Sequence, residues 1–251
     1  MQCPAMVIQK FFPNFKIIAV NIVFSALVIC QQAAADLPQN FTATYKAKYR
    51  GIGITATRSL ETLADGSQKF TFSADSFIAN LKETSQFHWN DNDHIIPEHY
   101  TYTRGGLGRD RKAVLNFDWS KNQVKNDVQG KPWNMSIPDL ALDKLSYQLQ
   151  LRTDLINGKE LGEYQIADGG KLKQYGFEVL GEEELKTPAG RFQVVKVKRL
   201  REQDDERQTV IWFAKNWDYM VVRLQQEEDD KSYEIDLVSA TLNGKKVKGG
   251  E

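Results

Sequence analysis

Apolar and polar residues alternate along most of the chain that follows residue 40. In the segment 41–50, Phe41, Ala43 and Tyr45 alternate with threonine and lysine residues. Strict alternation is typical of a β-strand with one buried and one solvated face. The same pattern predicts further strands over residues 54–63, 69–78, 82–89, 99–104, 112–119, 123–128, 163–167, 172–180, 192–200, 208–214, 220–226 and 232–242.

One segment in the middle of the chain has helical spacing instead. Between residues 138 and 156, Leu142, Leu145 and Leu149 recur every three or four positions, which is the period of one helix face. Asn157–Gly158 follows and is a good stop signal for a helix. The pattern predicts an amphipathic helix of about five turns, at 3.6 residues per turn.

About a dozen short strands and one helix predict a single domain of the mainly β class over residues 36–243. Alternation along most strands implies that one face of the sheet is wet or lines a cavity. A strongly curved antiparallel sheet, either a barrel or a half-barrel with the amphipathic helix packed on it, meets this requirement. A β-sandwich is the alternative. The polar residues 244–251 are predicted to form a flexible tail.

The first 35 residues differ from the rest and predict export. Lys10 and Lys16 precede an apolar stretch over residues 17–29, and Ala33-Ala34-Ala35 follows it. Basic residues, a short apolar stretch and an A-x-A site are typical of a removable secretory signal. The apolar stretch is short for a membrane helix, which needs about 20 residues, although an uncleaved anchor remains an alternative. We therefore expect a mature periplasmic protein that does not span the membrane.

Both cysteines, Cys3 and Cys30, lie in this predicted signal. A lipoprotein anchored through Cys30 is a weaker alternative, because the bulky Ile29 occupies a position that such processing reserves for a small residue. Loss of residues 1–35 leaves no disulfide, thiolate nucleophile or cysteine metal site. The whole chain has 33 basic and 33 acidic residues, and this neutrality argues against a nucleic-acid binder.

Several short segments together resemble a known family. They are Asn-Phe-Asp-Trp at 116–119, Leu-Asp-Lys-Leu-Ser at 142–146, Leu-Arg at 151–152, Thr-Pro-Ala-Gly-Arg-Phe at 187–192, Val-Ile-Trp-Phe-Ala at 210–214 and Tyr-Met-Val-Val-Arg at 219–223. In this order they resemble the DUF3108 family of bacterial envelope proteins, whose function is unknown. The sequence departs from the family where Val221–Val222 replaces an expected proline. The resemblance implies a periplasmic location and a β-rich, barrel-like or lipoprotein-carrier-like fold, and it transfers no catalytic residue.

No group of residues predicts catalysis, a cofactor or a metal. His88, His94 and His99 lie near several carboxylates, but a zinc site needs three or four converging ligands, and the acidic residues around 91–93 favour a solvated turn. No serine has the G-x-S-x-G context of a hydrolase nucleophile. The acidic runs at 182–184 and 227–230 are predicted as exposed turns.

The most distinctive local feature is the segment 104–111, Arg-Gly-Gly-Leu-Gly-Arg-Asp-Arg. Glycines free the backbone to approach an anion, and arginines bind phosphate or carboxylate. A Walker lysine is missing, so the segment is no nucleotide loop, and a plain hairpin loop with a basic tip is the simpler interpretation. Aromatic residues on neighbouring strands usually form core but line a pocket in a larger curved sheet. The predicted binding residues are Arg104, Arg109, Arg111, Tyr100, Tyr102, Trp89 and Trp119.

These observations support three hypotheses for function. The leading one is a non-enzymatic periplasmic protein that binds an amphipathic envelope molecule, such as a lipid, or a partner protein in or on a curved sheet. The second is an interaction protein with a filled interior that supports envelope machinery. The third is an envelope hydrolase, which requires carboxylates or His88 and His99 to converge in a cleft.

Overall fold

The computed structural model describes residues 37–49, 52–106, 108–200, 207–228 and 231–250. These residues belong to one compact unit that runs from Ala35 to Glu251. The predicted signal over residues 1–35, with Cys3 and Cys30, lies outside the described residues.

Sixteen strands form one sheet. The first eight are β1 (Phe41–Tyr49), β2 (Ile52–Thr62), β3 (Gln68–Asp75), β4 (Ala79–Trp89), β5 (Ile95–Gly106), β6 (Arg111–Asp118), β7 (Gln123–Val128) and β8 (Lys131–Ser136). The others are β9 (Leu142–Asp143), β10 (Glu163–Asp168), β11 (Lys171–Thr187), β12 (Gly190–Arg199), β13 (Arg207–Ala214), β14 (Met220–Glu228), β15 (Lys231–Leu242) and β16 (Lys245–Lys246). A 3-10 turn, η1 (Lys215–Trp217), precedes β14.

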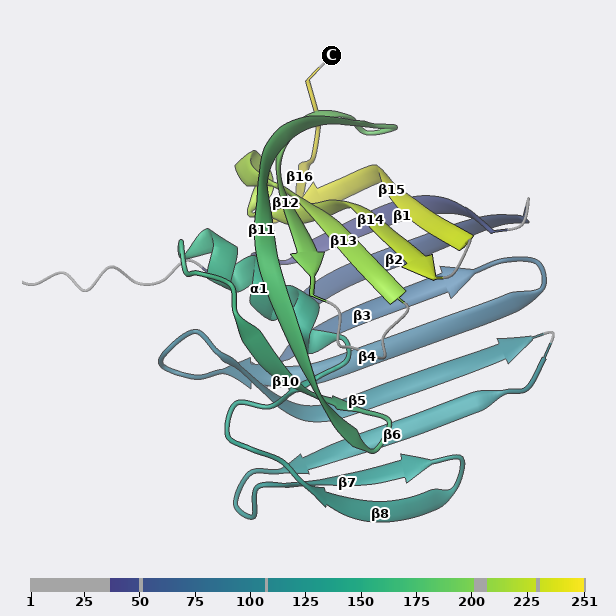
Figure 1. The fold of residues 1–251 in the computed structure, drawn as a ribbon, viewed down its shortest axis with the longest axis vertical. Coiled ribbons are helices and arrows are strands. Elements are labelled where there is room, and N and C mark those ends of the chain that lie inside the picture. The colour runs from purple at the N-terminus through teal and green to yellow at the C-terminus, as the bar shows by residue number, and fades with distance from the viewer. Residues whose placement is uncertain (1–36, 50–51, 107, 201–206, 229–230, 251) are drawn as a thin grey trace, which may run out of the picture. The chain divides into compact units, whose positions relative to one another are not determined.

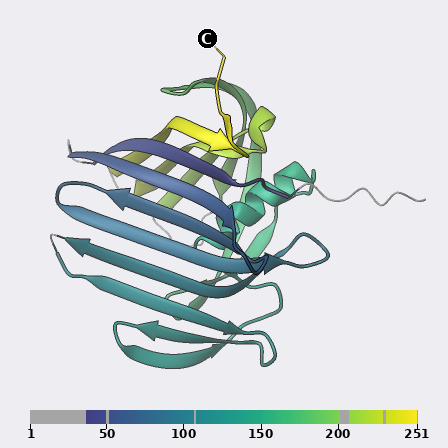
Figure 2. The ribbon, with the colours of Figure 1, turned by 180° about the vertical axis from the view of Figure 1, so that it is seen from behind.

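The strand order is β8-β7-β6-β5-β4-β3-β2-β1-β15-β14-β13-β12-β11-β10-β9, and β16 pairs with β15. Neighbouring strands are antiparallel except β9 and β10, which run parallel. The sheet curls so that β11–β14 lie over β1–β4, as Figures 1 and 2 show from opposite sides. Within the described residues β8 and β9 do not pair. The strongly curved antiparallel sheet is confirmed as an unclosed barrel with one helix, and the sandwich alternative is wrong.

The helix α1 (Ser146–Ile156) begins later than the pattern predicts. Leu142 and Asp143 form β9 beside β10 instead of a first helical turn, and Leu140 has a φ of 62°, which no helix contains. The carboxylate of Asp143 accepts the backbone N–H groups of Leu145 and Ser146, each at 2.8 Å, and so fixes the helix start. The predicted end at Asn157 is confirmed.

The helix is buried on almost every side, so the prediction of an amphipathic helix is wrong. Its buried residues include the polar side chains of Gln150, Arg152 and Asp154. Tertiary partners explain this, because Gln150 Oε1 accepts the backbone N–H of Ile95 on β5 at 2.8 Å. The helix therefore fills the inside of the curved sheet, and its polar side chains bond to the walls.

One strand was not predicted at all, and another runs further than predicted. The sequence did not predict β8, because Pro132 and its mostly exposed residues hide the pattern, as is usual for an edge strand. Strand β11 continues through Glu182, Glu183 and Glu184, which the sequence placed in an exposed turn. These carboxylates bond across the sheet: Glu182 accepts Lys215 Nζ at 2.5 Å, and Glu183 accepts Trp212 Nε1 at 2.5 Å.

The chain end, which composition predicts to be a flexible tail, contacts the sheet up to Gly250. Strand β16 pairs with β15, and the side chain of Val247 is buried. Gly250 exchanges backbone hydrogen bonds with Arg191 at 2.8 and 3.0 Å. Polar composition misled the prediction, since backbone groups and one apolar side chain hold this segment.

A gap separates β8, at one end of the sheet, from β9, β10 and β11 at the other end. We call this gap the seam, and a side chain bridges it. The ring of Trp133 on β8 lies against Gly170 in the β10–β11 turn, so close that a Cβ on Gly170 would lie 1.7 Å from Trp133 Cζ2. Gly169 beside it has open space. A ring packed on a bare backbone thus joins edges that share no backbone hydrogen bond.

We predict that Gly170→Ala destabilises the protein more than Gly169→Ala. Both residues have positive φ, 89° and 57°, so each alanine costs roughly 1–2 kcal/mol of conformational strain. Only Gly170→Ala must also displace the Trp133 ring, which adds about 1–3 kcal/mol, as overpacking does. Urea unfolding measures the difference. In a Trp133→Ala background the difference between the two alanines should shrink, because only backbone strain remains, and an unchanged difference there would contradict the seam contact.

Candidate functional site

A pocket of about 380 Å³ lies across the seam. We call it the seam pocket. One side comes from β5, β6 and β7, and the other from the residue after β9 and the β10–β11 turn. Its lining residues are Tyr100, Tyr102, Arg109, Arg111, Lys112, Ala113, Val128, Gln129, Lys144, Asp168 and Gly169.

The apolar wall of the seam pocket follows from strand alternation. Tyr100 and Tyr102 are two residues apart on β5 and point to the same face. Ala113 on β6 lies opposite Tyr102 in the register and also opposite Val128 on β7. The small Ala113 side chain between two larger ones leaves space above the sheet, which the pocket occupies.

Cations give the rest of the seam pocket a positive charge. Arg109 lies in the β5–β6 connection, and Arg111 and Lys112 begin β6. Arg111 also lies directly opposite Arg104 in the register, and like charges in such a pair repel each other. Neither arginine forms an ion pair with a described residue. A bound anion would relieve this repulsion.

The fourth cation of the seam pocket, Lys144, is partly neutralised. Its Nζ lies 4.0 Å from Asp168 Oδ1 and 5.6 Å from the centre of the Tyr102 ring. Asp168, the one carboxylate that lines the pocket, also accepts Lys173 Nζ at 2.6 Å. Asp168 is therefore occupied by lysines, and the arginines remain available to a ligand.

Hydrogen bonds hold the segment 104–111, which we call the basic loop, at its described residues 104–106 and 108–111. Arg104 Nη2 donates to the carbonyl of Arg109 at 3.2 Å. From the β7–β8 turn, Gln129 donates to the carbonyl of Asp110 at 2.9 Å and accepts the backbone N–H of Lys112 at 2.7 Å. A braced loop loses little freedom when it binds a ligand, which favours affinity. Arg104 thus supports the loop without lining the pocket.

Two buried carboxyl groups lie behind the pocket wall. Tyr100 donates its hydroxyl to Glu83 Oε2 at 2.8 Å, and Ser85 donates to Asp143 Oδ2 at 2.5 Å. Burial raises the pKa of Glu83, which the positive charge of Lys144 opposes. Burial also raises the pKa of Asp143 in spite of its hydrogen bonds. The pKa of Tyr100 is raised by burial and by the Glu83 charge, so its hydroxyl keeps its proton.

The other predicted site residues lie elsewhere. Trp89 packs edge-on against Phe87, with ring centres 5.3 Å apart. Trp119 stacks on Phe117 at 5.7 Å and donates its indole N–H to the carbonyl of Pro97 at 2.7 Å. These contacts occupy both tryptophans with the sheet, and neither lines the seam pocket.

The three histidines of the described chain have separate partners. His88 Nδ1 lies 3.1 Å from Glu98 Oε1, His94 Nε2 lies 2.9 Å from the carbonyl of Leu140, and His99 Nδ1 lies 2.7 Å from Asn116 Oδ1. Within the described residues no three histidine, cysteine or acidic side chains are grouped as a metal would need. The hydrolase hypothesis required His88 and His99 to converge with carboxylates, and the structure gives them different partners.

Sequence reasoning missed Lys112, Lys144, Gln129 and Asp168. Lys112 adjoins the basic loop and could have been found by extending it. Gln129 reaches the pocket because the β7–β8 turn lies beside Lys112 at the start of β6. Lys144 and Asp168 reach it only because the seam brings the residue after β9 and the end of β10 to the β5–β7 side. The burial of Glu83 could have been predicted from the sequence, because Glu83 shares the inward face of β4 with Ser85 and Phe87.

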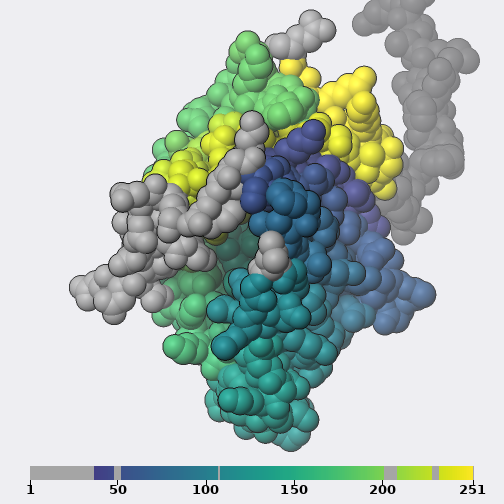
Figure 3. All heavy atoms as spheres, turned by 90° about the vertical axis from the view of Figure 1, so that its right-hand side faces the viewer, coloured from purple at the N-terminus to yellow at the C-terminus, as the bar shows by residue number. Residues whose placement is uncertain are grey.

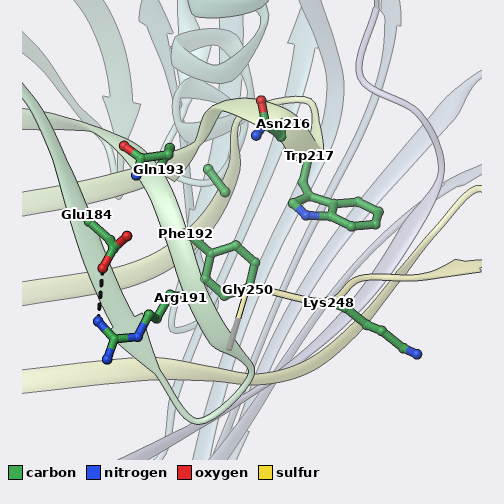
Figure 4. A pocket seen from close by; sticks show the side chains of 9 residues that line it. Glu184, Arg191, Phe192, Gln193, Asn216, Trp217, Lys248 and Gly250 are labelled. Carbon is green, nitrogen blue, oxygen red and sulfur yellow. Dashed lines mark hydrogen bonds and ion pairs between the residues drawn. The ribbon is translucent and has the colours of Figure 1, made fainter.

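A second pocket, of about 270 Å³, lies where the chain end meets β12 and η1 (Figure 4). Its arginine is already paired, since Arg191 Nη1 lies 3.0 Å from Glu184 Oε1. Phe192 and Trp217 provide its aromatic surface. The seam pocket is larger, and its arginines are free of carboxylates among the described residues, so it is the stronger candidate site.

Comparisons with known proteins address the family and the fold. The sequence model of a family described as "Protein of unknown function (DUF3108)" matches residues 41–238. No curated protein matches the chain. A β-barrel-like protein of the DUF1849 domain from Brucella abortus shares 8% identity with a TM-score of 0.53, covering 83% of this chain and 99% of that one. This likeness supports the barrel-like fold alone.

Two further structures resemble the chain more weakly. A candidate lipoprotein from Parabacteroides distasonis has 12% identity and a TM-score of 0.30, covering 82% of this chain and 97% of its own. A porin-like protein from Bacteroides uniformis has 10% identity and a TM-score of 0.27, covering 83% and 99%. Among the described residues of the present chain, no helix has the length and apolar character needed to cross a membrane.

We predict that Asp143→Asn is tolerated and that it flattens the pH dependence of stability. The pKa of Asp143 in the folded state is raised above its ordinary 3.8, so its contribution to stability is fully present below pH 3.8 and is lost as pH rises through the folded pKa. Asparagine stays neutral, can donate to Ser85 and can accept the backbone N–H groups. Urea unfolding at a series of pH values from 3.8 upwards should show that the free energy of unfolding falls less with rising pH in this variant than in the parent.

Asp143→Leu is the matched control. Leucine leaves the N–H groups of Leu145 and Ser146 without an acceptor, which costs roughly 1–3 kcal/mol for each buried unpaired group. Equal destabilisation by asparagine and leucine, or an unchanged pH profile in the asparagine variant, would show that Asp143 is not held in its neutral form.

Proposed function

The chain belongs to the DUF3108 family, whose function is unknown, and we propose that it binds an amphipathic molecule with an anionic group in the seam pocket. The observation that carries this proposal is the meeting of an apolar wall with unpaired arginines in one pocket. Tyr102, Ala113 and Val128 suit an apolar portion, while Arg109 and Arg111 suit phosphate, sulfate or carboxylate.

The size of the seam pocket narrows the ligand. Ligand pockets commonly measure about 300–1,000 Å³, and this pocket lies near the lower end at about 380 Å³. Such a volume holds an anionic head and the first part of an apolar chain. A lipid or a related envelope molecule fits this description, with the remainder of its chain outside the pocket.

We further propose that the protein is exported to the periplasm and acts there without catalysis. Support comes from the predicted signal over residues 1–35 and from the start of the compact unit at Ala35. A periplasmic binding role also agrees with a pocket that offers charge and apolar surface but no arranged nucleophile and base.

Binding is tested by calorimetry with dodecyl phosphate below its micelle concentration and with neutral dodecanol as the comparison ligand. We predict that the parent prefers the phosphate and that Arg109→Ser with Arg111→Ser weakens its binding at least about tenfold, because each charge-assisted hydrogen bond is worth roughly 1.5–3 kcal/mol. Lys125→Ser, which removes an exposed lysine of β7 outside the pocket, is the control and should bind like the parent.

Equal affinity for the phosphate and the alcohol would contradict an anion site in the seam pocket. Unchanged phosphate binding by the double arginine variant would place the ligand elsewhere.

Export is tested at the predicted processing site. We predict that Ala35→Leu blocks removal of residues 1–35, because signal peptidase needs small residues at the first and third positions of the A-x-A site. Ala34→Leu changes the middle position and should be processed normally. Intact-mass measurement of the protein from the periplasmic fraction checks both, and processing of both variants alike would contradict a cut after Ala35.

A second candidate function, that of an interaction protein, is favoured by the free edge of β8. Strand β8 ends the sheet, and no described strand pairs with its outer side. Such an edge can accept a strand from a partner protein. Trp133 against Gly170 and the Pro132 ring restrict the edge, so we place this function behind ligand binding.

A further inference from the structure

Phe77 projects into solvent at the turn between β3 and β4. Its exposed fraction is 83%, the highest among the large exposed apolar residues of the described chain. Single exposed apolar residues are common on protein surfaces, so exposure alone assigns no role.

The fold does not use the Phe77 ring. Polar bonds of Ser76 build the turn, because its backbone N–H donates to the carbonyl of Ala79 at 2.9 Å and its hydroxyl oxygen accepts the N–H of Ala79 at 3.1 Å. These bonds would persist with any residue at position 77. A full phenyl ring in water therefore brings no gain to folding.

The turn that carries Phe77 is locked to the basic loop. Gly106 pairs with Ala79 in the β4–β5 register, and a Cβ on Gly106 would lie 2.4 Å from the carbonyl oxygen of Ile78. Both connections lie at the same end of their strands, on the right in Figure 1 and facing the viewer in Figure 3. The exposed ring and the basic loop thus form one surface.

This surface has an excess of positive charge. Over residues 75–79 and 104–112 the described chain contains Arg104, Arg109, Arg111 and Lys112 against Asp75 and Asp110. None of these four cations forms an ion pair within the described part of the chain. We call Phe77 together with residues 104–106 and 108–112 the basic rim.

An aromatic ring beside unpaired cations is suited to an anionic lipid surface. Aromatic side chains favour the headgroup level of a bilayer, and lysines and arginines near the surface are attracted to anionic lipids. A protein partner would more often bind a broad apolar patch, because the cores of protein–protein interfaces are depleted in charged residues. The basic rim has one ring and four cations.

We propose that the basic rim docks on an anionic membrane surface, with Phe77 inserted among the headgroups. Arg109, Arg111 and Lys112 also line the seam pocket, so docking turns the pocket mouth towards the bilayer. This inference goes beyond ligand binding and stands without it, because Phe77 does not line the pocket.

Vesicle co-sedimentation tests the docking. The processed protein, which lacks residues 1–35, is mixed with vesicles of phosphatidylcholine alone or with phosphatidylglycerol, and binding to the neutral vesicles gives the level that needs no anionic lipid. We expect binding to the anionic vesicles to exceed this level and to fall as salt is raised, because salt screens exposed charges. We expect Phe77→Ser to weaken it about fivefold or more, through loss of the apolar anchor.

Three variants complete the test. Leu180→Ser removes another exposed apolar residue, on β11 away from the basic rim, and should bind vesicles like the parent. Phe77→Trp should keep binding, because tryptophan also favours the headgroup level. Dodecyl phosphate binding by Phe77→Ser should equal that of the parent, which separates docking from the pocket.

Equal vesicle binding by the parent and Phe77→Ser would overturn the proposal, as would equal binding to neutral and anionic vesicles. If the parent binds anionic vesicles but does not bind dodecyl phosphate, the proposed function of the seam pocket is overturned and docking remains supported.

Discussion

The sheet curls without closing, and this constraint governs the rest of the structure. Backbone hydrogen bonds join fifteen strands in one path from β8 to β9, but none joins these two end strands within the described chain. The two edges are joined instead by the Trp133 side chain, which packs against Gly170 across the seam. Side chains fill an uneven gap less completely than a strand would, and the seam pocket occupies what remains.

An unclosed barrel also needs a filled interior, and the helix fills it with charge as well as apolar surface. Buried Arg58 donates to Gln148 of the helix at 2.5 Å. Arg152 of the helix donates to the carbonyl of Asp218 at 2.5 Å, and burial lowers its pKa to about 10. Because a buried charge without a partner is costly, these bonds disfavour any shift of the helix. The helix is thereby fixed against both halves of the sheet.

The curved sheet, most strands and the basic loop could be predicted from the sequence, because alternation and turn residues act over a few neighbouring positions. The helix start, β8 and the path of Glu182–Glu184 could not. Each depends on partners distant in the chain, such as the β10 backbone beside Leu142. The candidate site shows the same difference between local and distant signals. Arg109 and Tyr102 could be predicted from their residue types and local pattern, but Lys144 and Asp168 line the pocket only because of the seam.

The position of the seam pocket ties its chemistry to the edge of the sheet. A closed barrel would bring β8 and β9 into register and place strand atoms where Lys144 now lies over the Tyr102 ring and Asp168 lines the pocket. Arg104 and Arg111 would remain opposed on neighbouring strands, without the pocket that Arg111 now lines. Arg109 lies in the braced connection, Arg111 and Lys112 begin β6, and the apolar wall lies on the strands. The open edge would let the proposed ligand reach both the cations and the apolar wall. Incomplete closure is therefore what leaves room in this β fold for the amphipathic site that we propose.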